Sequence, residues 1–191
     1  MIDTSLYSYM SEILKRTPTT FVRYKYADID WNSRLVGIVG PRGVGKSTMI
    51  QQHILNSKSM ENYLYVSADN TFFSTNSLIS LADDFVKEGG THLFIDEVHK
   101  YKGWSRELKQ IYDVHPDLHV VFTGSSVLDI RQGEADLSRR ALIYNMQGLS
   151  FREYLELFHG IKVPVYSLEE ILSHKIDIPQ LSHPLPLFRE Y

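Results

Sequence analysis

The feature that most constrains the fold is a glycine-rich octapeptide, Gly-Pro-Arg-Gly-Val-Gly-Lys-Ser, at residues 40–47. It matches the pattern G-x-x-x-x-G-K-[ST], and Thr48 follows it. A continuous apolar run precedes it at residues 35–39, and a helix-forming stretch begins at Lys46. Glycines let successive backbone N–H groups point inward, and the start of a helix adds its positive end. A loop of this kind, between a buried strand and a helix, predicts a cradle for phosphate groups.

The polar side chains of this loop have distinct expected roles. We expect the Lys46 ammonium to reach the β- and γ-phosphates of ATP and to assist catalysis, and the Ser47 hydroxyl to ligate Mg²⁺. The residues predicted to contact the nucleotide are Gly40, Pro41, Arg42, Gly43, Val44, Gly45, Lys46, Ser47 and Thr48.

A second motif is an apolar run that ends in two carboxylates. Residues 93–95, Leu-Phe-Ile, are followed directly by Asp96 and Glu97. An acidic pair alone is typical of a solvated strand end, but here one strand-like segment at residues 63–67 separates it from the phosphate loop. We therefore expect Asp96 to hold Mg²⁺ through water and Glu97 to activate the attacking water as general base. A glutamate at this position favours hydrolysis over transfer to an external hydroxyl.

A third motif is the segment Val-Val-Phe-Thr-Gly-Ser-Ser at residues 120–126. In a sheet of this type its strand lies between the phosphate-loop strand and the acidic strand, so its end faces the γ-phosphate. Thr123 or Ser125 is then expected to bond the γ-phosphate or the attacking water. The alternative for Ser125 is a simple cap of the helix predicted at residues 126–131.

Two arginines precede the last predicted strand. Either Arg139 or Arg140 is a candidate to neutralise charge at a γ-phosphate, most plausibly that of a neighbouring subunit, and Arg140 is favoured. The alternative is a surface pair that balances Glu134 and Asp136.

Apolar periodicity indicates an α/β fold in which strands alternate with helices. Short continuous apolar runs predict buried parallel strands. These strands are predicted at residues 35–39, 63–67, 92–95, 118–122 and 141–146. Helices are predicted at residues 4–16, 46–56, 77–88 and 104–114, then from two Ser/Glu capping boxes at 150–153 and 167–170. Residues 19–31 are expected to be extended, and the chain from Pro179 onward to be an extended Pro-rich linker or the start of a truncated lid or C-terminal domain.

Composition excludes several classes of protein. The 191 residues contain no cysteine, which excludes a disulfide scaffold, a cysteine nucleophile and a Cys-ligated zinc site. The net charge of −3 does not support nucleic-acid binding, although the basic and aromatic loop at residues 99–104 leaves open a contact with nucleic acid or a protein partner. No apolar run approaches the ~20 residues of a membrane span, and residues 1–10 do not read as a signal peptide, so we expect a cytoplasmic protein.

Taken together, these motifs resemble those of the AAA+ ATPases, and more closely those of a prokaryotic AAA family in which the ATPase domain precedes an uncharacterised C-terminal domain. The resemblance rests on GPRGVGKST at 40–48, FIDEVHKYKGW at 94–104, VFTGSS at 121–126 and DLSRRALIYNMQGLSFREYL at 136–155. Arg140 takes the position of an arginine of that family, whereas Arg139 stands where the family commonly has glycine.

The resemblance implies a P-loop NTPase three-layer sandwich with strand order 5-1-4-3-2. It also implies a helical lid and a C-terminal domain that this sequence largely lacks, and a homo-oligomer in the full-length protein. The expected organisation is an N-terminal helix at residues 1–18, the ATPase domain at 19–160, and a short helix with a Pro-rich linker at 161–191.

Three functions remain open from the sequence. The leading one is Mg-ATP hydrolysis, with an unknown protein as the expected partner. A nucleotide-dependent switch with little turnover is the second, since the lid is missing. A small-molecule kinase is the third, and Glu97 argues against it.

Overall fold

Five short apolar runs form one parallel sheet in the computed structural model, which describes residues 2–57, 60–125, 137, 139–173, 176, 178–181 and 183–191. The strands are β1 (Leu35–Val39), β2 (Tyr63–Ser67), β3 (His92–Asp96), β4 (His119–Gly124) and β5 (Leu142–Asn145). Their order is β2-β3-β4-β1-β5, which is the predicted order read from the other edge. All four pairings are parallel, so the carboxyl ends of the strands meet at one edge of the sheet.

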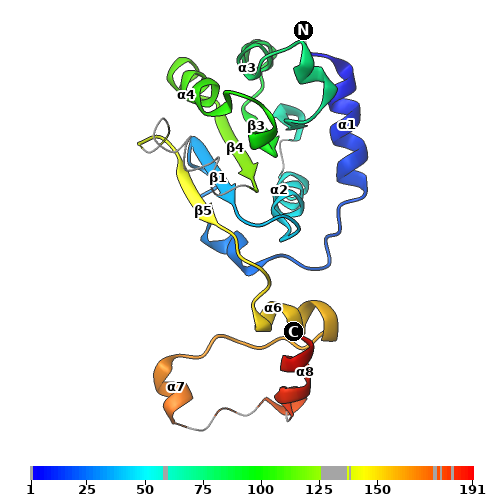
Figure 1. Ribbon diagram of the computed structural model, residues 1–191, viewed down its shortest axis with the longest axis vertical. Helices are drawn as coiled ribbons and strands as arrows, with labels where there is room; N and C mark the ends of the chain where they lie inside the picture. Colours follow the sequence, from blue (N-terminus) through cyan, green and yellow to red (C-terminus); the bar gives the residue numbers. More distant parts are fainter. Residues whose placement is uncertain are drawn as a thin grey trace. The chain divides into compact units, whose positions relative to one another are not determined.

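Alternation along the strands produces two apolar faces. One face packs against the N-terminal helix α1 (Thr4–Lys15) and α2 (Lys46–Leu55), and the other against α3 (Leu78–Lys87) and α4 (Trp104–Val114) (Figure 1). The first layer buries Met10, Leu14, Val36, Ile38, Met49, Ile50, Ile54, Tyr65, Phe94 and Val121. The second layer buries Leu35, Leu64, Val66, Leu78, Leu81, Phe85, Leu93, Ile95, Trp104, Leu108, Ile111, Val120 and Phe122. Helices on both faces of the sheet confirm the three-layer sandwich.

Helix α1 also protects an edge of the sheet. β2 is an outer strand, and its Tyr65 N–H donates to the Met10 sulfur of α1 over 3.2 Å. Leu6, one turn earlier on α1, packs into the opposite layer, so the helix wraps the β2 edge. Asp3 caps the helix by accepting from the Ser5 N–H.

Most predicted boundaries agree with the structure, and two segments do not. Residues 19–31 were expected to be extended, but Tyr24–Asp28 form the 3₁₀-helix η1, in which the Tyr26 ring packs against Trp31. The extended conformation predicted from Pro179 is wrong, because η5 (Pro179–Leu181) and α8 (Pro184–Glu190) are helical. Proline is compatible with the first helical turn, where the backbone N–H has no intrahelical acceptor in any case. The short helix predicted for residues 126–131 lies outside the described residues.

The remaining 3₁₀-helices are short connections within the α/β unit. They are η2 (Met60–Asn62), η3 (Thr71–Ser74) and η4 (Val98–Lys100).

The contacts divide the chain into two compact units, Met1–Gln147 and Gly148–Tyr191. The second unit contains α6 (Phe151–His159), α7 (Leu168–Leu172) and α8, and both predicted capping boxes are present at the starts of α6 and α7. Phe151 of α6 packs edge-on against Phe188 of α8 with ring centroids 5.2 Å apart. The division falls before the boundary at residue 160 expected from the sequence, and the extent of the ATPase domain itself stays a prediction.

Candidate functional site

The glycine-rich loop adopts conformations that require glycine. Gly40 has φ 156°, and an added Cβ would lie 2.0 Å from the carbonyl oxygen of Met146. Gly45 has φ 95° and stands at the N-cap position of α2. The chain therefore turns sharply from β1 into α2 and aims the N-terminus of that helix at the loop's concave side.

The Lys46 side chain points back onto the backbone of the phosphate loop. Its Nζ donates to the carbonyl oxygens of Gly40 over 3.0 Å and Pro41 over 2.8 Å, and the residue is only 4% exposed. Burial lowers the pKa of Lys46, while the carboxylates of Glu97 and Asp96 act in the opposite direction. The ammonium is thus held in place by the loop's own backbone.

Asp96 ends β3 as a buried carboxylate held by two hydroxyls. Tyr65 on β2 donates to Asp96 Oδ2 over 2.7 Å, and Thr123 on β4 donates to Oδ1. Burial, and then the charge of Asp96, raise the pKa of Tyr65, so this phenol stays protonated and acts as a donor. Gln51 of α2 in turn donates to the Tyr65 hydroxyl over 3.1 Å.

Thr123 occupies a different place from the one expected. It is fully buried, its hydroxyl donates to Asp96, and the same oxygen accepts the Glu97 N–H over 2.9 Å. Its side chain therefore fixes the acidic pair from behind.

Glu97 has the one left-handed backbone among the described non-glycine residues, with φ 55°. A residue of this type in that region of φ/ψ space costs roughly 1–3 kcal/mol unless its surroundings hold it there. Here Thr123 holds the Glu97 N–H, and Glu97 Oε2 lies 3.3 Å from His99 Nε2.

One cavity of about 560 Å³ brings the loop and the acidic pair together. It is lined by Arg42, Gly43, Gly45, Lys46, Ser47, Thr48, Asp69, Glu97, His99, Lys100 and Ser125. The other predicted loop residues make contacts outside the cavity lining. The Gly40 and Pro41 carbonyls accept hydrogen bonds from the Lys46 ammonium, and the Val44 carbonyl accepts one from the Arg23 guanidinium. Asp96 and Thr123 stand behind Glu97.

Four contributors to this region were not predicted as site residues. Asp69, His99 and Lys100 line the cavity, and Tyr65 holds Asp96. Asp69 and Tyr65 belong to the region around the end of β2, so their proximity follows once β2 is placed beside β3. His99 and Lys100 lie two and three residues after Glu97, and that closeness in sequence was the available signal.

The basic and aromatic loop after the acidic pair is mostly structural. Trp104 is buried at the start of α4 and packs against Phe122 with ring centroids 5.6 Å apart. The Tyr101 hydroxyl donates to Glu107 Oε1 over 2.8 Å. Trp104 therefore anchors the start of α4 against the sheet.

Arg140 lies away from the cavity. Its guanidinium makes a two-pronged contact with Asp113 of α4, with distances of 2.9 Å and 3.0 Å. This contact lowers the pKa of Asp113. Arg139 is exposed, and Glu134 and Asp136, its suggested partners, lie outside the described residues.

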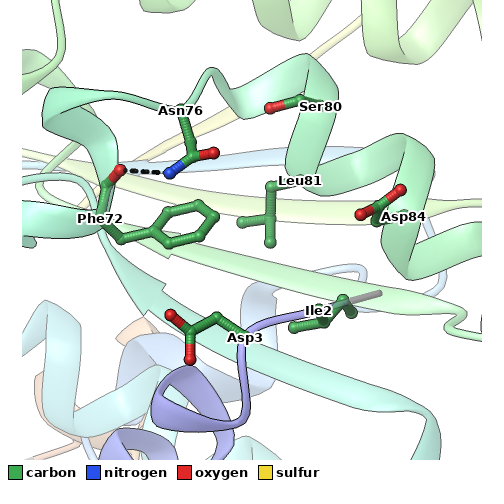
Figure 2. Close-up of a pocket in the computed structure, with 7 residues that line it drawn as sticks. All are labelled: Ile2, Asp3, Phe72, Asn76, Ser80, Leu81 and Asp84. Atoms are coloured by element: carbon green, nitrogen blue, oxygen red, sulfur yellow. Dashed lines mark hydrogen bonds between the residues drawn. The ribbon is translucent and has the colours of Figure 1, made fainter.

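A second cavity of about 310 Å³ lies between the start of α1 and the η3–α3 region (Figure 2). Its lining includes Ile2, Phe72 and Leu81, and its polar groups take part in local structure. Asp3 caps α1, and Asn76 donates to the Phe72 carbonyl over 2.9 Å. No residue of the phosphate loop or the acidic pair is among the described residues that line it.

The oxygen donors of the first cavity suit Mg²⁺ better than a softer metal. Within the described part of the chain, no three His, Asp or Glu side chains gather to hold a metal ion. The Ser47 hydroxyl and the nearby carboxylates are hard oxygen donors, the type that holds Mg²⁺ together with water and phosphate oxygens. Over the same part of the chain, no helix combines the length and apolar character needed to cross a bilayer.

The sheet order, the loop and the helices on both faces define a P-loop NTPase fold of the AAA+ type. The chain belongs to the family described as AAA domain, which matches residues 32–155. It is 32% identical over 163 residues to an uncharacterized protein of Methanocaldococcus jannaschii, covering 80% of this chain and 34% of that relative. The chain thus spans about a third of that relative's length.

Solved structures share the fold at low identity. PCH-2 of C. elegans superposes with a TM-score of 0.50 at 17% identity, over 97% of this chain and 55% of that one. The S. cerevisiae Hsp104–ADP complex superposes with a TM-score of 0.56 at 17% identity, over 81% of this chain and 28% of that one. The S. cerevisiae Hsp104–casein complex gives a TM-score of 0.54 at 16% identity, over 81% and 34% of the two chains.

We predict that Tyr65→Phe destabilises the protein by about 1–3 kcal/mol, because a buried carboxylate loses a donor and the Gln51 amide loses an acceptor. The measurement is the free energy of unfolding in urea. Tyr63→Phe is the matched control on the same face of β2, and it should change stability by less than about 0.5 kcal/mol. Equal stability of the two variants would contradict the role assigned to the Tyr65 hydroxyl.

Proposed function

We propose that this AAA domain binds Mg-ATP and hydrolyses it. The observation that carries the proposal is that Lys46, Ser47 and Glu97, from two separate motifs, line one cavity. A phosphate-binding cation, a hydroxyl ligand for Mg²⁺ and a candidate general base are therefore within reach of one substrate. The similar Hsp104 structure is a complex with ADP, which supports an adenine nucleotide as the ligand of this fold.

In this proposal the loop binds and orients the phosphates. The backbone N–H groups of residues 42–48, at the N-terminus of α2, bind the phosphate oxygens, and Lys46 turns its ammonium from the Gly40 and Pro41 carbonyls to the β- and γ-phosphates. Bound Mg²⁺ would neutralise charge on the phosphate oxygens. Ser47 would be its protein ligand, and Asp96 would hold its water.

Asp96 is suited to act through water. Each of its oxygens accepts one hydroxyl hydrogen bond, from Tyr65 or Thr123, and a carboxylate oxygen can accept a second. The two hydroxyls fix the carboxylate plane, so the free lone pairs have a set direction.

Glu97 takes the proton of the attacking water. Its backbone, fixed by the Thr123 contact, places the residue at the cavity wall, whereas Asp96 stays buried behind it. The adjacent carboxylates thereby have separate roles, one toward the metal and the other toward water.

Arg140 is proposed to act on the nucleotide of a neighbouring subunit in a homo-oligomer. It precedes β5, an edge strand, and lies outside its own chain's cavity. A partly exposed ion pair such as that of Arg140 with Asp113 stabilises a protein by about 0–1 kcal/mol. Replacement of this ion pair by a contact with phosphate therefore costs little free energy. A head-to-tail assembly supplies such an arginine in trans.

The first test is Lys46→Ala, which should abolish measurable Mg-ATP affinity in isothermal titration calorimetry, because the cation on the β- and γ-phosphates is lost. Lys102→Ala, an exposed lysine that does not line the cavity, removes the same charge and should bind normally. Unchanged affinity in a folded Lys46→Ala variant would refute the phosphate site.

The second test is Glu97→Gln, which should bind Mg-ATP normally and release phosphate about 10²- to 10⁴-fold more slowly, since an amide cannot take the proton. Phosphate release is measured with no acceptor added. Glu61→Gln, at an exposed position, makes the same chemical change and should turn over like the wild type. ATP binding by the wild type without phosphate release would instead favour the nucleotide-dependent switch.

The third test mixes two inactive variants, Lys46→Ala and Arg140→Ala. Arg140→Ala alone should lower turnover by about 10³-fold or more while ATP affinity stays within a few-fold. The mixture should recover activity where an intact nucleotide site meets an intact arginine. Arg139→Ala is the adjacent control and should retain turnover; if it is the inactive variant and Arg140→Ala is active, the arginine has been assigned wrongly.

A further inference from the structure

His99 is a cavity residue whose contacts join the ends of two strands. It lies on η4, directly after the acidic pair, and its side chain is only 11% exposed. Its Nε2 lies 3.3 Å from Glu97 Oε2 and 3.0 Å from Ser125 Oγ. Ser125 follows β4, so one imidazole ring bridges Glu97 at the end of β3 and Ser125 at the end of β4.

The backbone of Ser125 identifies the protonated ring nitrogen. The Ser125 N–H donates to His99 Nδ1 over 3.4 Å, and a backbone N–H can only donate. In this contact Nδ1 is the acceptor, which places the ring proton on Nε2. The single Nε2–H hydrogen then has two acceptors within reach, Ser125 Oγ at 3.0 Å and Glu97 Oε2 at 3.3 Å.

A donor on one carboxylate oxygen orients a general base. The Glu97 backbone is held by Thr123, but that contact leaves the side-chain torsions free to rotate. The His99 contact on Oε2 restricts those torsions and leaves Oε1 to accept a proton from water. Proton transfer requires the base within about 2.6–3.2 Å of the proton's oxygen, so loss of orientation lowers the rate without changing phosphate binding.

We propose that His99 is a positioning residue that orients Glu97, with its own tautomer set by Ser125. The inference rests on the proposed hydrolysis. It assigns to Ser125 a role in holding His99, in addition to its predicted contact with the γ-phosphate or water.

The first arm of the test compares His99→Phe with His99→Gln. Phenylalanine keeps a ring but removes both nitrogens, whereas the glutamine amide keeps an N–H donor at a similar reach. His99→Phe should lower kcat by about 10-fold or more with KM and Mg-ATP affinity within about twofold, and His99→Gln should restore most of the rate. A kcat of His99→Phe equal to that of the wild type would overturn the proposal.

The second arm asks whether His99 acts through Glu97. In a Glu97→Gln background, His99→Phe should change the remaining rate by less than about twofold, because the oriented base is already gone. A full additional loss would mean that His99 serves the reaction or the fold independently of Glu97, and would overturn the proposal.

The third arm does not depend on turnover. Nitrogen-15 NMR of the histidine rings in the wild-type protein at mildly alkaline pH should show His99 as the Nε2–H tautomer. An Nδ1–H ring would refute the arrangement. Failure of the wild type to release phosphate, with the Nε2–H tautomer present, would instead locate the error in the proposed hydrolysis.

Discussion

The site depends on the insertion of β4 between β1 and β3. β4 pairs with β1 on one side and with β3 on the other, so the phosphate-loop strand and the acidic strand are second neighbours with Thr123 between them. Because parallel strands end at the same edge, the hydroxyl of Thr123 meets both Asp96 and the Glu97 N–H. The acidic pair therefore has its geometry only when the whole sheet is assembled.

A buried carboxylate at this position is stable only if its partners are complete. Removal of a carboxylate from water is costly, and hydrogen bonds in a low-dielectric interior recover that cost when every member is satisfied. Around Asp96 the chain of donors runs from Thr17 to Gln51, then to Tyr65 and the carboxylate. Thr17 follows α1 and lies before the family match at residues 32–155, so the N-terminal segment contributes to the support of the acidic pair.

Much of the fold follows from local patterns in the sequence. Continuous apolar runs marked all five strands, and the glycines of the loop marked the turn into α2, because these signals are local and strong. Pairings across the sheet carry no such signal. The Tyr65–Asp96 and Arg140–Asp113 contacts join residues on different elements, and nothing in the sequence around either residue specifies its partner.

Amino-acid composition did not predict the conformation of the proline-rich segment near the end of the sequence, because proline occurs both in linkers and at the starts of helices. The chain from Pro179 was expected to be extended because prolines cluster there, yet Pro184 begins α8. A proline at the first helical position and a proline in a linker have the same local composition, and the contacts of Phe188 with Phe151 favour the helix. Tertiary packing decides between the helix and the extended linker, and the number of prolines gives no information about that packing.

The candidate general base, Glu97, is also the non-glycine residue with a left-handed backbone conformation in the described part of the chain, and the two properties are connected. A left-handed glutamate lowers stability relative to glycine at the same φ, and a glycine there would fold with less strain. The conformation turns the Glu97 N–H toward Thr123, away from the path of a regular strand, and starts η4 directly after β3. His99 reaches the carboxylate only because η4 begins there. The strain at Glu97 and the proximity of His99 therefore have a single cause, which is the tight turn at the end of β3.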